Sequence, residues 1–418
     1  MRALAIVDGE HYPPVVRAAL DELPYEFVAA VLVGGSEKLR GGADYGVPLV
    51  QNLDAGLAEH APEVVVDLSD EPVLGPVERL ALASRVLLHG IPYVGADFRL
   101  EPPARRPFEL PSLAVVGTGK RVGKTAVTGH LVRLLAASRD VVVVAMGRGG
   151  PPEPELVTVQ PTVESLVELS RTGRHAASDH LETAALTGAR TVGCRRCGGG
   201  LAGAVAISNV AEGAAVAAGL RPELVVFDGS GAALPPIASD RTVAVVGGHQ
   251  DPAVASGYLN AYRLLLADLV VVTMAEDGSG WEQVRDAVAA VAGPETPVAS
   301  TVLRPRPAAD VAGRRVAYFC TAPRSAHAVL AGHLRDRYGA EVVHVSGNLA
   351  DRSALHQELR GLDADVFLVE LKAAAVDVVA ETAVERGVEV VLAANDVVSV
   401  EAGVDLDEEL LEVAKLQG

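Results

Sequence analysis

One stretch of the sequence combines residue types and spacing that suit the binding of a nucleotide phosphate. Residues 117–125 read G-T-G-K-R-V-G-K-T, between a short apolar run at 113–116 and a segment with apolar residues at helical spacing. In a strand, glycine-rich loop and helix of this kind, backbone N–H groups and the helix N-terminus offer donors to a polyphosphate. Lys124 would reach the β- and γ-phosphates, and the hydroxyl of Thr125 would ligate Mg²⁺. The stretch therefore predicts a site for ATP and Mg²⁺.

The loop departs from the usual pattern G-x-x-x-x-G-K-[ST] at one position. Thr118 replaces the first glycine of that pattern, and Gly117 stands one place earlier. A glycine-rich turn that only packs tightly is the alternative, but the G-K-T, the strand and the helix together favour nucleotide binding. Lys120 adds a second cation to the loop, although the whole chain has only five lysines. Contact with the nucleotide is predicted for Gly117, Thr118, Gly119, Lys120, Arg121, Val122, Gly123, Lys124, Thr125 and Ala126.

A buried strand that ends in an acidic residue is the second sign of a nucleotide site. Residues 222–231 read P-E-L-V-V-F-D-G-S-G, which places Asp228 at the end of an apolar run. In phosphate-loop enzymes an aspartate at this place holds or orients Mg²⁺. The alternative is a turn residue before Gly229. The phosphate loop in the same domain favours the catalytic interpretation.

A proline-rich loop follows the predicted strand at 140–146. It reads G-R-G-G-P-P-E-P-E over 147–155, and a loop in this place can carry an arginine for the transferred phosphoryl group and a carboxylate for Mg²⁺. Arg148 is the candidate arginine, and Glu153 and Glu155 are the candidate metal ligands. The alternative is a surface loop whose charges only aid solubility. The predicted catalytic residues are Lys120, Lys124, Arg148 and Asp228.

Two further motifs have more than one interpretation. C-R-R-C-G-G-G at 194–200 suggests zinc or redox chemistry, but a structural zinc site needs four ligands and Cys320 is the only other cysteine. Arg195 and Arg196 beside three glycines therefore favour a cradle for an anion. S-D-H-L-E at 178–182 would open a helix, where the serine or aspartate caps the N-terminus and the glutamate completes a capping box.

Other candidate cations follow predicted strands that are far from the phosphate loop in sequence. His11 follows the first strand, at 3–7, where parallel sheets bind ligands; the alternative is a histidine that lies on the surface or caps a helix. Arg324 and Lys372 follow strands in the last third of the chain. For Lys372 the alternative is simple pairing with a neighbouring glutamate. Substrate binding is predicted for His11, Arg148, Arg195, Arg196, Arg324 and Lys372.

Strand and helix patterns alternate along the chain, and these elements must position the candidate residues. At 418 residues the chain is long for one core, and the alternation predicts an α/β fold with mostly parallel sheets. The stretch 100–111 has four prolines and is typical of an extended linker. We expect an N-terminal α/β domain at 1–108, a central P-loop NTPase domain at 112–312 and a C-terminal α/β domain at 313–418. The two flanking domains should be Rossmann-like.

Composition restricts the possible partners of the chain. The net charge of −18 argues against binding to nucleic acid or to an anionic membrane. No run of about 18 apolar residues suits a membrane span, and the first residues lack the apolar segment of a signal peptide. Three cysteines without a disulfide-like pattern fit a reducing compartment. We therefore expect a cytoplasmic protein whose anionic small-molecule substrate is held by a local cluster of cations.

Six segments together resemble one known family, the cyclic 2,3-diphosphoglycerate synthetases, and the resemblance covers nearly the whole chain. They are D-G-E-H-Y-P-P at 8–14, G-A-D-F-R-L-E-P-P at 95–103, the phosphate loop, S-D-H-L-E, C-R-R-C-G-G-G and V-F-D-G-S-G. The phosphate loop is also similar to that of dethiobiotin synthetase, where ATP activates a small acid. The resemblance implies a Mg²⁺-requiring, ATP-dependent ligase that closes 2,3-diphosphoglycerate to its cyclic form and releases ADP and phosphate. A homodimer is the expected assembly.

Two alternatives stay open at this point. One is another P-loop ligase or kinase that acts on a related phosphorylated acid, and the other is a nucleotide-dependent switch or partitioning ATPase. 2,3-Diphosphoglycerate carries about five negative charges, so an acidic protein must gather several cations at one cleft. No dedicated general base is needed, because phosphate oxygens are already ionised at about pH 7. The cations expected at the cleft are Lys120, Arg148, Arg195, Arg196 and either Arg324 or Lys372.

Overall fold

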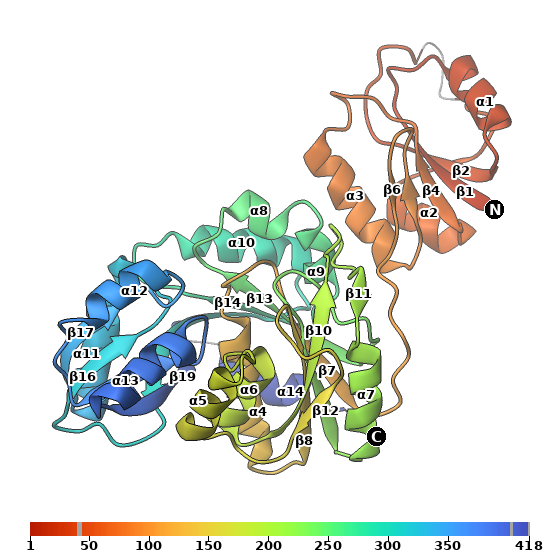
Figure 1. The fold of residues 1–418 in the computed structure, drawn as a ribbon. Helices are drawn as coiled ribbons and strands as arrows, with labels where there is room; N and C mark the ends of the chain where they lie inside the picture. Colours follow the sequence, from red (N-terminus) through yellow and green to blue (C-terminus); the bar gives the residue numbers. More distant parts are fainter. Residues whose placement is uncertain (40–43, 402–403, 417–418) are drawn as a thin grey trace.

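The computed structural model describes residues 1–39, 44–401 and 404–416, and two sheets lie within these residues (Figure 1). The first sheet belongs to the N-terminal unit and has the strand order β3-β2-β1-β4-β5-β6, with all neighbours parallel except β5 and β6. Its strands are β1 (Arg2–Val7), β2 (Glu26–Leu32), β3 (Leu49–Val50), β4 (Val64–Asp67), β5 (Tyr93–Val94) and β6 (Arg99–Leu100). Its helices are α1 (Pro13–Glu22), α2 (Leu53–His60) and α3 (Pro76–Leu88).

The second sheet has 13 strands in the order β11-β10-β8-β12-β7-β13-β14-β15-β19-β18-β16-β17, and β9 pairs with β10. Its first part is the P-loop unit. The strands of this unit are β7 (Ser112–Gly117), β8 (Val141–Gly147), β9 (Glu155–Val157), β10 (Arg190–Cys197), β11 (Ile207–Ser208), β12 (Leu224–Asp228), β13 (Arg241–Gly247), β14 (Leu269–Thr273) and β15 (Val298–Pro307). The helices are α4 (Lys124–Ala136), α5 (Val163–Arg171), α6 (Asp179–Thr187), α7 (Val210–Gly219), α8 (Pro252–Ser256), α9 (Asn260–Leu265) and α10 (Trp281–Ala292).

The C-terminal unit supplies the remaining strands of the second sheet. These strands are β16 (Arg315–Phe319), β17 (Glu341–Ser346), β18 (Val366–Glu370) and β19 (Glu389–Ser399). The helices are the 3₁₀ helix η1 (Arg324–Ala326), α11 (His327–Tyr338), α12 (Arg352–Leu359), the π-helix η2 (Ala375–Ala380), α13 (Glu381–Arg386) and α14 (Leu406–Val413). The α/β fold with mostly parallel strands that the sequence predicts is confirmed.

One antiparallel strand pair joins the P-loop unit to the C-terminal unit. β15 pairs with β19 from Thr301 opposite Ser399 to Pro307 opposite Ala393. The C-terminal strands therefore extend the central sheet, a feature that strand patterns along the sequence do not reveal because the two strands are far apart in the chain. The domain limits at 108 and 312 stay predictions.

Helices cover both faces of the central sheet. On one face α4 and α14 pack together, with Leu131 of α4 and Leu410 of α14 in the same core. On the other face the core includes Val210 of α7 and Val284 of α10. Because both faces are covered, β8 is buried at every position, as expected for a central parallel strand. The last helix of the chain thus returns to support the helix that follows the phosphate loop.

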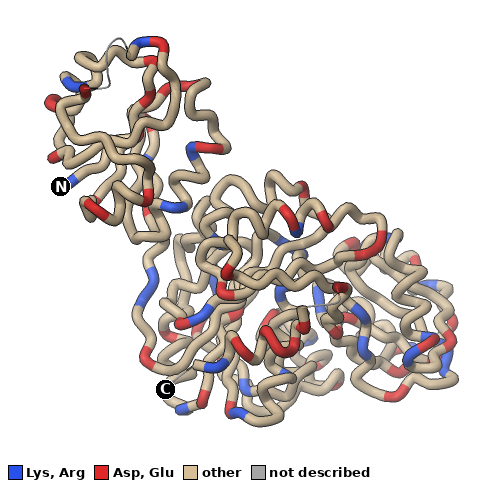
Figure 2. Tube along the Cα trace, turned by 180° about the vertical axis from the view of Figure 1, so that it is seen from behind, with Lys and Arg blue, Asp and Glu red and all other residues tan. Residues whose placement is uncertain are grey.

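The N-terminal unit forms a lobe of its own, joined to the rest through the linker (Figure 1). Arg106 in the linker forms a parallel bridge with Ile237, and α3 lies near α9, where Ser84 Oγ donates to the carbonyl of Tyr258 at 3.3 Å. Figure 2 shows acidic and basic residues interspersed along the trace. Every helix in the described part of the chain is too short or too polar to cross a bilayer.

Candidate active site

The phosphate loop has the predicted strand, loop and helix. β7 ends at Gly117, and α4 begins at Lys124 directly after Gly123, whose φ of 80° favours glycine. Arg121 adopts a φ of 63°, which costs a non-glycine residue about 1 kcal/mol. Backbone strain of this kind concentrates at ligand-binding loops. The loop conformation therefore agrees with a binding role.

The close approach of a second loop explains the unusual glycine spacing. A Cβ atom on Gly117 would lie 2.9 Å from the carbonyl oxygen of Gly231, so only glycine fits there. Thr118 is buried, and its N–H donates to the carbonyl of Val245 at 3.0 Å. Its hydroxyl donates to Oε1 of Gln250 at 2.6 Å. Thr118 therefore ties the loop to the region around the end of β13. A glycine at this position would lack the hydroxyl that bonds to Gln250.

Asp228 lies at the end of β12, directly below the phosphate loop, and is fully buried. Its Oδ1 atom accepts hydrogen bonds from the Lys124 ammonium and from the Thr128 hydroxyl, the latter at 2.9 Å. Its Oδ2 atom is buried without a hydrogen-bond partner among the described residues. A buried carboxylate oxygen without a partner is costly. The arrangement suits an oxygen that a bound cation would satisfy.

Thr125 begins α4 beside Lys124, and Lys124 contacts Asp228, so both predicted Mg²⁺ ligands belong to the phosphate-loop region. The two candidate glutamates lie elsewhere. Mg²⁺ usually takes one or two protein ligands and completes its shell with phosphate oxygens and water. The described residues contain no preformed group of three or more His, Cys, Asp or Glu side chains suited to a metal. Glu155 contacts Arg174, and Glu153 is exposed in the loop before β9. No contact brings either glutamate to Asp228 in the described structure.

Arg148 and Arg196, here called the arginine pair, converge above Gly231. A Cβ atom on Gly231 would lie 2.6 Å from Nη2 of Arg148 and 3.7 Å from Nη2 of Arg196. Arg196 donates to the carbonyls of Gly198 and Ser230, both at 2.9 Å. Burial and then the charge of Arg148 lower the pKa of Arg196. Two guanidinium groups held so close favour an anion between them. Because Gly231 also touches the phosphate loop at Gly117, the arginine pair lies next to that loop.

The first turn of α6 carries two carboxylates that sequence reasoning missed. Ser178 is the N-cap residue but makes no capping hydrogen bond, and its hydroxyl instead lies 3.1 Å from Nδ1 of His180. The capping-box interpretation of S-D-H-L-E is therefore wrong. Asp179 and Glu182 are three residues apart and share one face of the helix. This pair of acids three residues apart was the signal that the sequence offered.

The pKa shifts of the two carboxylates reflect burial and the charges of residues around the phosphate loop. Burial raises the pKa of Asp179, while the charge of Lys124 lowers it and the charge of Asp228 raises it. Burial also raises the pKa of Glu182 to about 7, and the nearby ammonium of Lys372 opposes this shift. Carboxylates that share a confined space disfavour one another's charge. The site therefore concentrates acids as well as cations around the phosphate loop.

Lys372 brings the C-terminal unit into the site. Its ammonium lies 3.6 Å from Oε1 of Glu182 on α6 and 3.9 Å from Oε2 of Glu370 at the end of β18. Burial alone would lower the pKa of Lys372, but the charges of Glu370 and Glu182 outweigh burial and raise it. Lys372 therefore pairs with a neighbouring glutamate, Glu370, which was the alternative interpretation of this lysine. It also contacts Glu182 of the P-loop unit. Glu370 is itself fixed by Asn395, whose Nδ2 donates to it at 2.9 Å.

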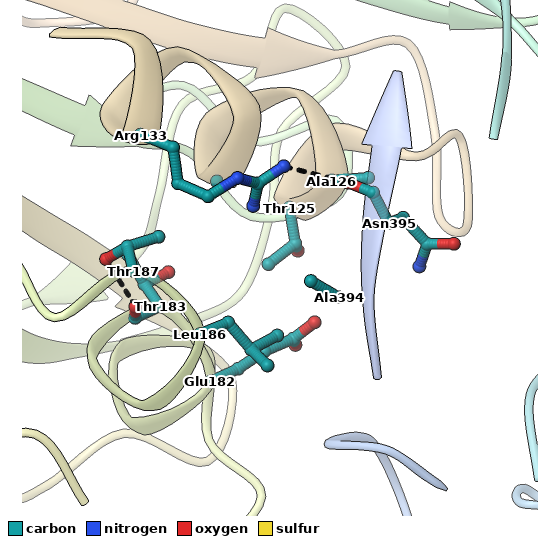
Figure 3. A pocket seen from close by; sticks show the side chains of 10 residues that line it. Thr125, Ala126, Arg133, Glu182, Thr183, Leu186, Thr187, Ala394 and Asn395 are labelled. Atoms are coloured by element: carbon teal, nitrogen blue, oxygen red, sulfur yellow. Dashed lines mark hydrogen bonds between the residues drawn. The ribbon is translucent and has the colours of Figure 1, made fainter. Parts of the chain in front are cut away.

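A pocket opens where α4, α6 and β19 meet (Figure 3). Thr125 and Glu182 point into it from opposite sides, and Asn395 lies at its edge on β19 (Figure 3). Arg133 of α4 donates to the carbonyl of Asn395 at 3.1 Å, which ties the helix to the strand. The candidate Mg²⁺ ligand Thr125 therefore faces a wall to which the C-terminal unit contributes.

Four predicted residues lie outside the contacts described above. Lys120 and Arg324 are exposed, the latter at the start of η1. Arg195 is exposed, and its backbone N–H donates to Asn209. His11 lies in the N-terminal lobe, where Nδ1 is 2.8 Å from Oδ1 of Asp8 and Nε2 is 3.4 Å from Oδ2 of Asp70. The structure does not bring His11 to the phosphate loop.

Three family models match the chain in succession. Their descriptions are the N-terminal domain of cyclic 2,3-diphosphoglycerate synthetase at residues 2–101, the P-loop domain at 112–302 and the C-terminal domain at 307–396. These three matches agree with the predicted three-domain layout around a central P-loop domain. They also support nucleotide binding by the central part.

Curated relatives match over nearly the full length. Cyclic 2,3-diphosphoglycerate synthetase of Rubrobacter xylanophilus is 51% identical, with 100% of this chain and 98% of the relative covered. The enzyme of the same name from Thermococcus gammatolerans is 45% identical, with 99% and 97% covered. Among solved structures, the apo form of LpxK from Aquifex aeolicus in complex with ATP aligns with a TM-score of 0.42 and 13% identity. That alignment covers 75% of this chain and 91% of LpxK.

Proposed function

Because the chain belongs to the cyclic 2,3-diphosphoglycerate synthetase family, we propose that it uses ATP to join the two phosphates of 2,3-diphosphoglycerate into a cyclic anhydride. The family predicted from the sequence is confirmed. Two neighbouring features carry the proposal. Lys124 contacts Asp228 at the phosphate loop, and the arginine pair lies around Gly231, which touches the same loop. Together they offer one place for a nucleotide phosphate and an adjacent place for a second polyanion.

The proposed reaction has two displacement steps. One phosphate oxygen of the acid attacks the γ-phosphorus of ATP in line, and ADP leaves. An oxygen of the neighbouring phosphate then attacks the activated phosphorus, inorganic phosphate leaves, and a P–O–P bond closes the ring. Because both ends of the substrate are held, the second step is effectively unimolecular. Lys124 and the arginine pair would offset the negative charge of the transferred group.

Mg²⁺ belongs to the proposal because Thr125 and Asp228 fit it. The Thr125 hydroxyl and the unpartnered Oδ2 of Asp228 would be its protein ligands. When bound, Mg²⁺ neutralises charge on the phosphates. Lys124 contacts Asp228, and on nucleotide binding it would turn toward the phosphates. The Thr128 hydroxyl then keeps Oδ1 of Asp228 occupied.

The remaining predicted residues form a second part of the proposal. Lys372 is paired with Glu182 and Glu370, and its role as a substrate cation stays a prediction. Lys120 is supported by its place on the phosphate loop. Arg195, Arg324 and His11 stay predictions, as do the homodimer and the cytoplasmic location.

Phosphorus NMR tests the proposed reaction directly. Wild-type protein with ATP, Mg²⁺ and 2,3-diphosphoglycerate should convert the two phosphomonoester signals of the acid into two coupled anhydride signals. One ADP and one phosphate should appear for each ring formed. Lys124→Ala should abolish product, while Lys415→Ala, which alters an exposed lysine paired with Glu412, should leave the rate unchanged.

Two results would contradict the proposal. A new phosphomonoester signal, without a coupled pair, would identify a kinase acting on a related acid. ATP hydrolysis that does not respond to 2,3-diphosphoglycerate would favour a switch ATPase.

The arginine pair has a separate test. Arg196→Ala should weaken the binding of 2,3-diphosphoglycerate by about tenfold or more, because one charge-assisted pair is worth roughly 1.5–3 kcal/mol. ATP binding, measured by calorimetry with Mg²⁺, should change much less. Equal losses for both ligands would mean that Arg196 is not a substrate contact.

A further inference from the structure

A second cavity lies between the P-loop unit and the C-terminal unit. Its walls are the loop between α5 and α6, which carries Arg174 and His175, and the start of the segment from Ala373 to Asp377. The cavity has a volume of about 290 Å³ and is partly open to solvent. None of the residues that line it is among the predicted nucleotide, metal or substrate contacts. The cavity is therefore a candidate site that the proposed function has not used.

The residues that directly follow Arg148 and Lys372 in the chain lie at this cavity. A Cβ atom on Gly149 would lie 2.9 Å from Cδ2 of His175, and Gly149 directly follows Arg148. Ala373, on the opposite wall, directly follows Lys372. The cavity therefore adjoins the place where the phosphates of the substrate would lie.

The wall from the C-terminal unit has an unusual backbone. Ala373 adopts a φ of 49°, which is unfavourable for a residue with a Cβ atom. The π-helix η2 begins two residues later, at Ala375. Short π-helices and strained residues occur preferentially at functional sites. The two features occur together at the wall that also carries Lys372, which supports a binding role for this wall.

The polar groups of the cavity favour a carboxylate. Arg174 is half exposed and contacts Glu155 through one Nη2 group, so other N–H donors of its guanidinium have no partner among the described residues. An arginine fork matches the two oxygens of a carboxylate. The one acid of the cavity, Asp377, is paired with Arg352. The positive charge of Arg352 therefore partly offsets the negative charge of Asp377.

We propose that this cavity binds the carboxylate of the substrate through Arg174 and His175. The inference rests on the proposed function, in which both phosphates of 2,3-diphosphoglycerate must lie together beside the arginine pair. The carboxylate is the only charged group that remains, and it is bonded directly to the carbon that carries one of the phosphates. Arg174 and His175 line the cavity between the chain segments that carry Arg148 and Lys372, and they are thus placed to hold the carboxylate. They would determine which bisphosphate the enzyme accepts.

The test compares two ligands that differ only at the carboxylate. Calorimetry with Mg²⁺ and ADP present measures the binding of 2,3-diphosphoglycerate and of glycerol 1,2-bisphosphate, in which a hydroxymethyl group replaces the carboxylate. Wild-type protein should prefer the acid by about tenfold or more. Arg174→Gln and His175→Ala should each reduce that preference by weakening only the acid. His175→Ala leaves the contact between Arg174 and Glu155 in place, so it tests the cavity without disturbing that pair.

Arg171→Gln is the matched control, because Arg171 is exposed at the end of α5 and does not line the cavity. It should keep the wild-type preference. The inference is overturned if both cavity variants keep the wild-type preference, or if wild-type protein cyclises the acid but binds the two ligands equally. Wild-type protein that binds neither ligand would overturn the proposed function together with this inference.

Discussion

Asp228 organises the charges of the candidate site at the residue scale. Its carboxylate is fully buried, and Lys124 and Thr128 both donate to one oxygen while the other has no partner among the described residues. The Thr128 hydroxyl holds the carboxylate in one rotamer, with Oδ2 left free. A group that orients a metal ligand in this way affects metal binding almost as strongly as the ligand itself. Thr128 is therefore a positioning residue for the proposed Mg²⁺ site.

Thr128→Val should weaken the use of Mg²⁺. Valine has the shape of threonine without the hydroxyl, so Asp228 would lose a hydrogen bond but no packing. The Mg²⁺ concentration for half-maximal product formation should rise by about tenfold. Thr128→Ser, which restores the hydroxyl, should return it close to the wild-type value. An unchanged Mg²⁺ requirement in the valine variant would exclude the positioning role.

Glu182 should make stability depend on pH. Burial raises its pKa from the ordinary 4.5 to about 7 in the folded protein. The folded state therefore holds this proton more tightly than the unfolded state. Its stabilising contribution is full below pH 4.5 and disappears as the pH rises through about 7.

Glu182→Gln removes this titration and provides the measurement. The free energy of unfolding of the variant minus that of wild type, obtained with urea, should increase by about 2 kcal/mol between about pH 5.5 and pH 8. Glu385→Gln alters an exposed glutamate on α13 and serves as the comparison, which should show no such increase. A pH-independent difference for Glu182→Gln would mean that its carboxylate is not held protonated near neutral pH.

At the scale of elements, α4 is held in place by β19 and α14, which come from the last part of the chain. Arg133 of α4 donates to β19, and His130 lies 2.6 Å from Oδ1 of Asp407 on α14. Arg139, just beyond the helix, donates to the carbonyl of Ala414 at 2.6 Å. Because α4 carries Lys124 and Thr125 at its start, its position determines the geometry of the phosphate loop. The C-terminal unit is therefore part of the support of the nucleotide site.

Leu410 and Leu411 on α14 allow a direct test of that support. Leu410 is fully buried against α4, whereas Leu411 is 36% exposed. Leu410→Ala should lower the free energy of unfolding by about 2–5 kcal/mol, as large cavities in cores do. Leu411→Ala should lower it by less than about 1 kcal/mol. Urea unfolding of the two variants measures the difference, and equal losses would show that α14 does not pack as described.

At the scale of the whole molecule, the two sheets have different relations to the site. The P-loop unit and the C-terminal unit share one sheet through β15 and β19, and both contribute to the pockets. The N-terminal lobe has its own sheet and touches the rest through the linker bridge at Arg106 and through α3 against α9. Nucleotide binding should thus depend on the shared sheet alone. His11 is the predicted substrate contact in the lobe.

Removal of residues 1–105 tests nucleotide binding by the shared sheet separately from the predicted substrate contact of the N-terminal lobe. The remaining chain should bind ATP within about twofold of the intact protein, because no residue of the phosphate loop contacts the lobe in the described structure. Product formation should be lost if His11 contacts the substrate, and His11→Ala in the full chain should reduce it as well. Calorimetry with ATP and phosphorus NMR provide the two measurements. Full product formation without the lobe would contradict the prediction for His11.

The local parts of the site could be predicted from the sequence. The glycine-rich loop, the lysine and threonine that begin α4 and the aspartate after β12 are encoded by neighbouring residues, since each follows an apolar strand pattern. Short-range pattern also defines strands: the strands predicted at 3–7 and 140–146 form as β1 and β8, with limits within one residue of the prediction. The Cys-x-x-Cys segment has several interpretations in the sequence. In the structure it forms the end of β10, and Cys194 is buried against α7.

Only the tertiary structure decided which distant side chains join the loop. The meeting of Glu182 with Lys372 depends on the pairing of β15 with β19, and no local pattern encodes a pairing between such distant strands. In the tertiary structure Glu155 pairs with Arg174 and does not contact Asp228. Sequence by itself therefore determined the nucleotide-binding chemistry, because that chemistry is built from contiguous residues. Packing between units decided the rest of the site, because a side chain's partner is set by the space in which its helix or strand finally lies.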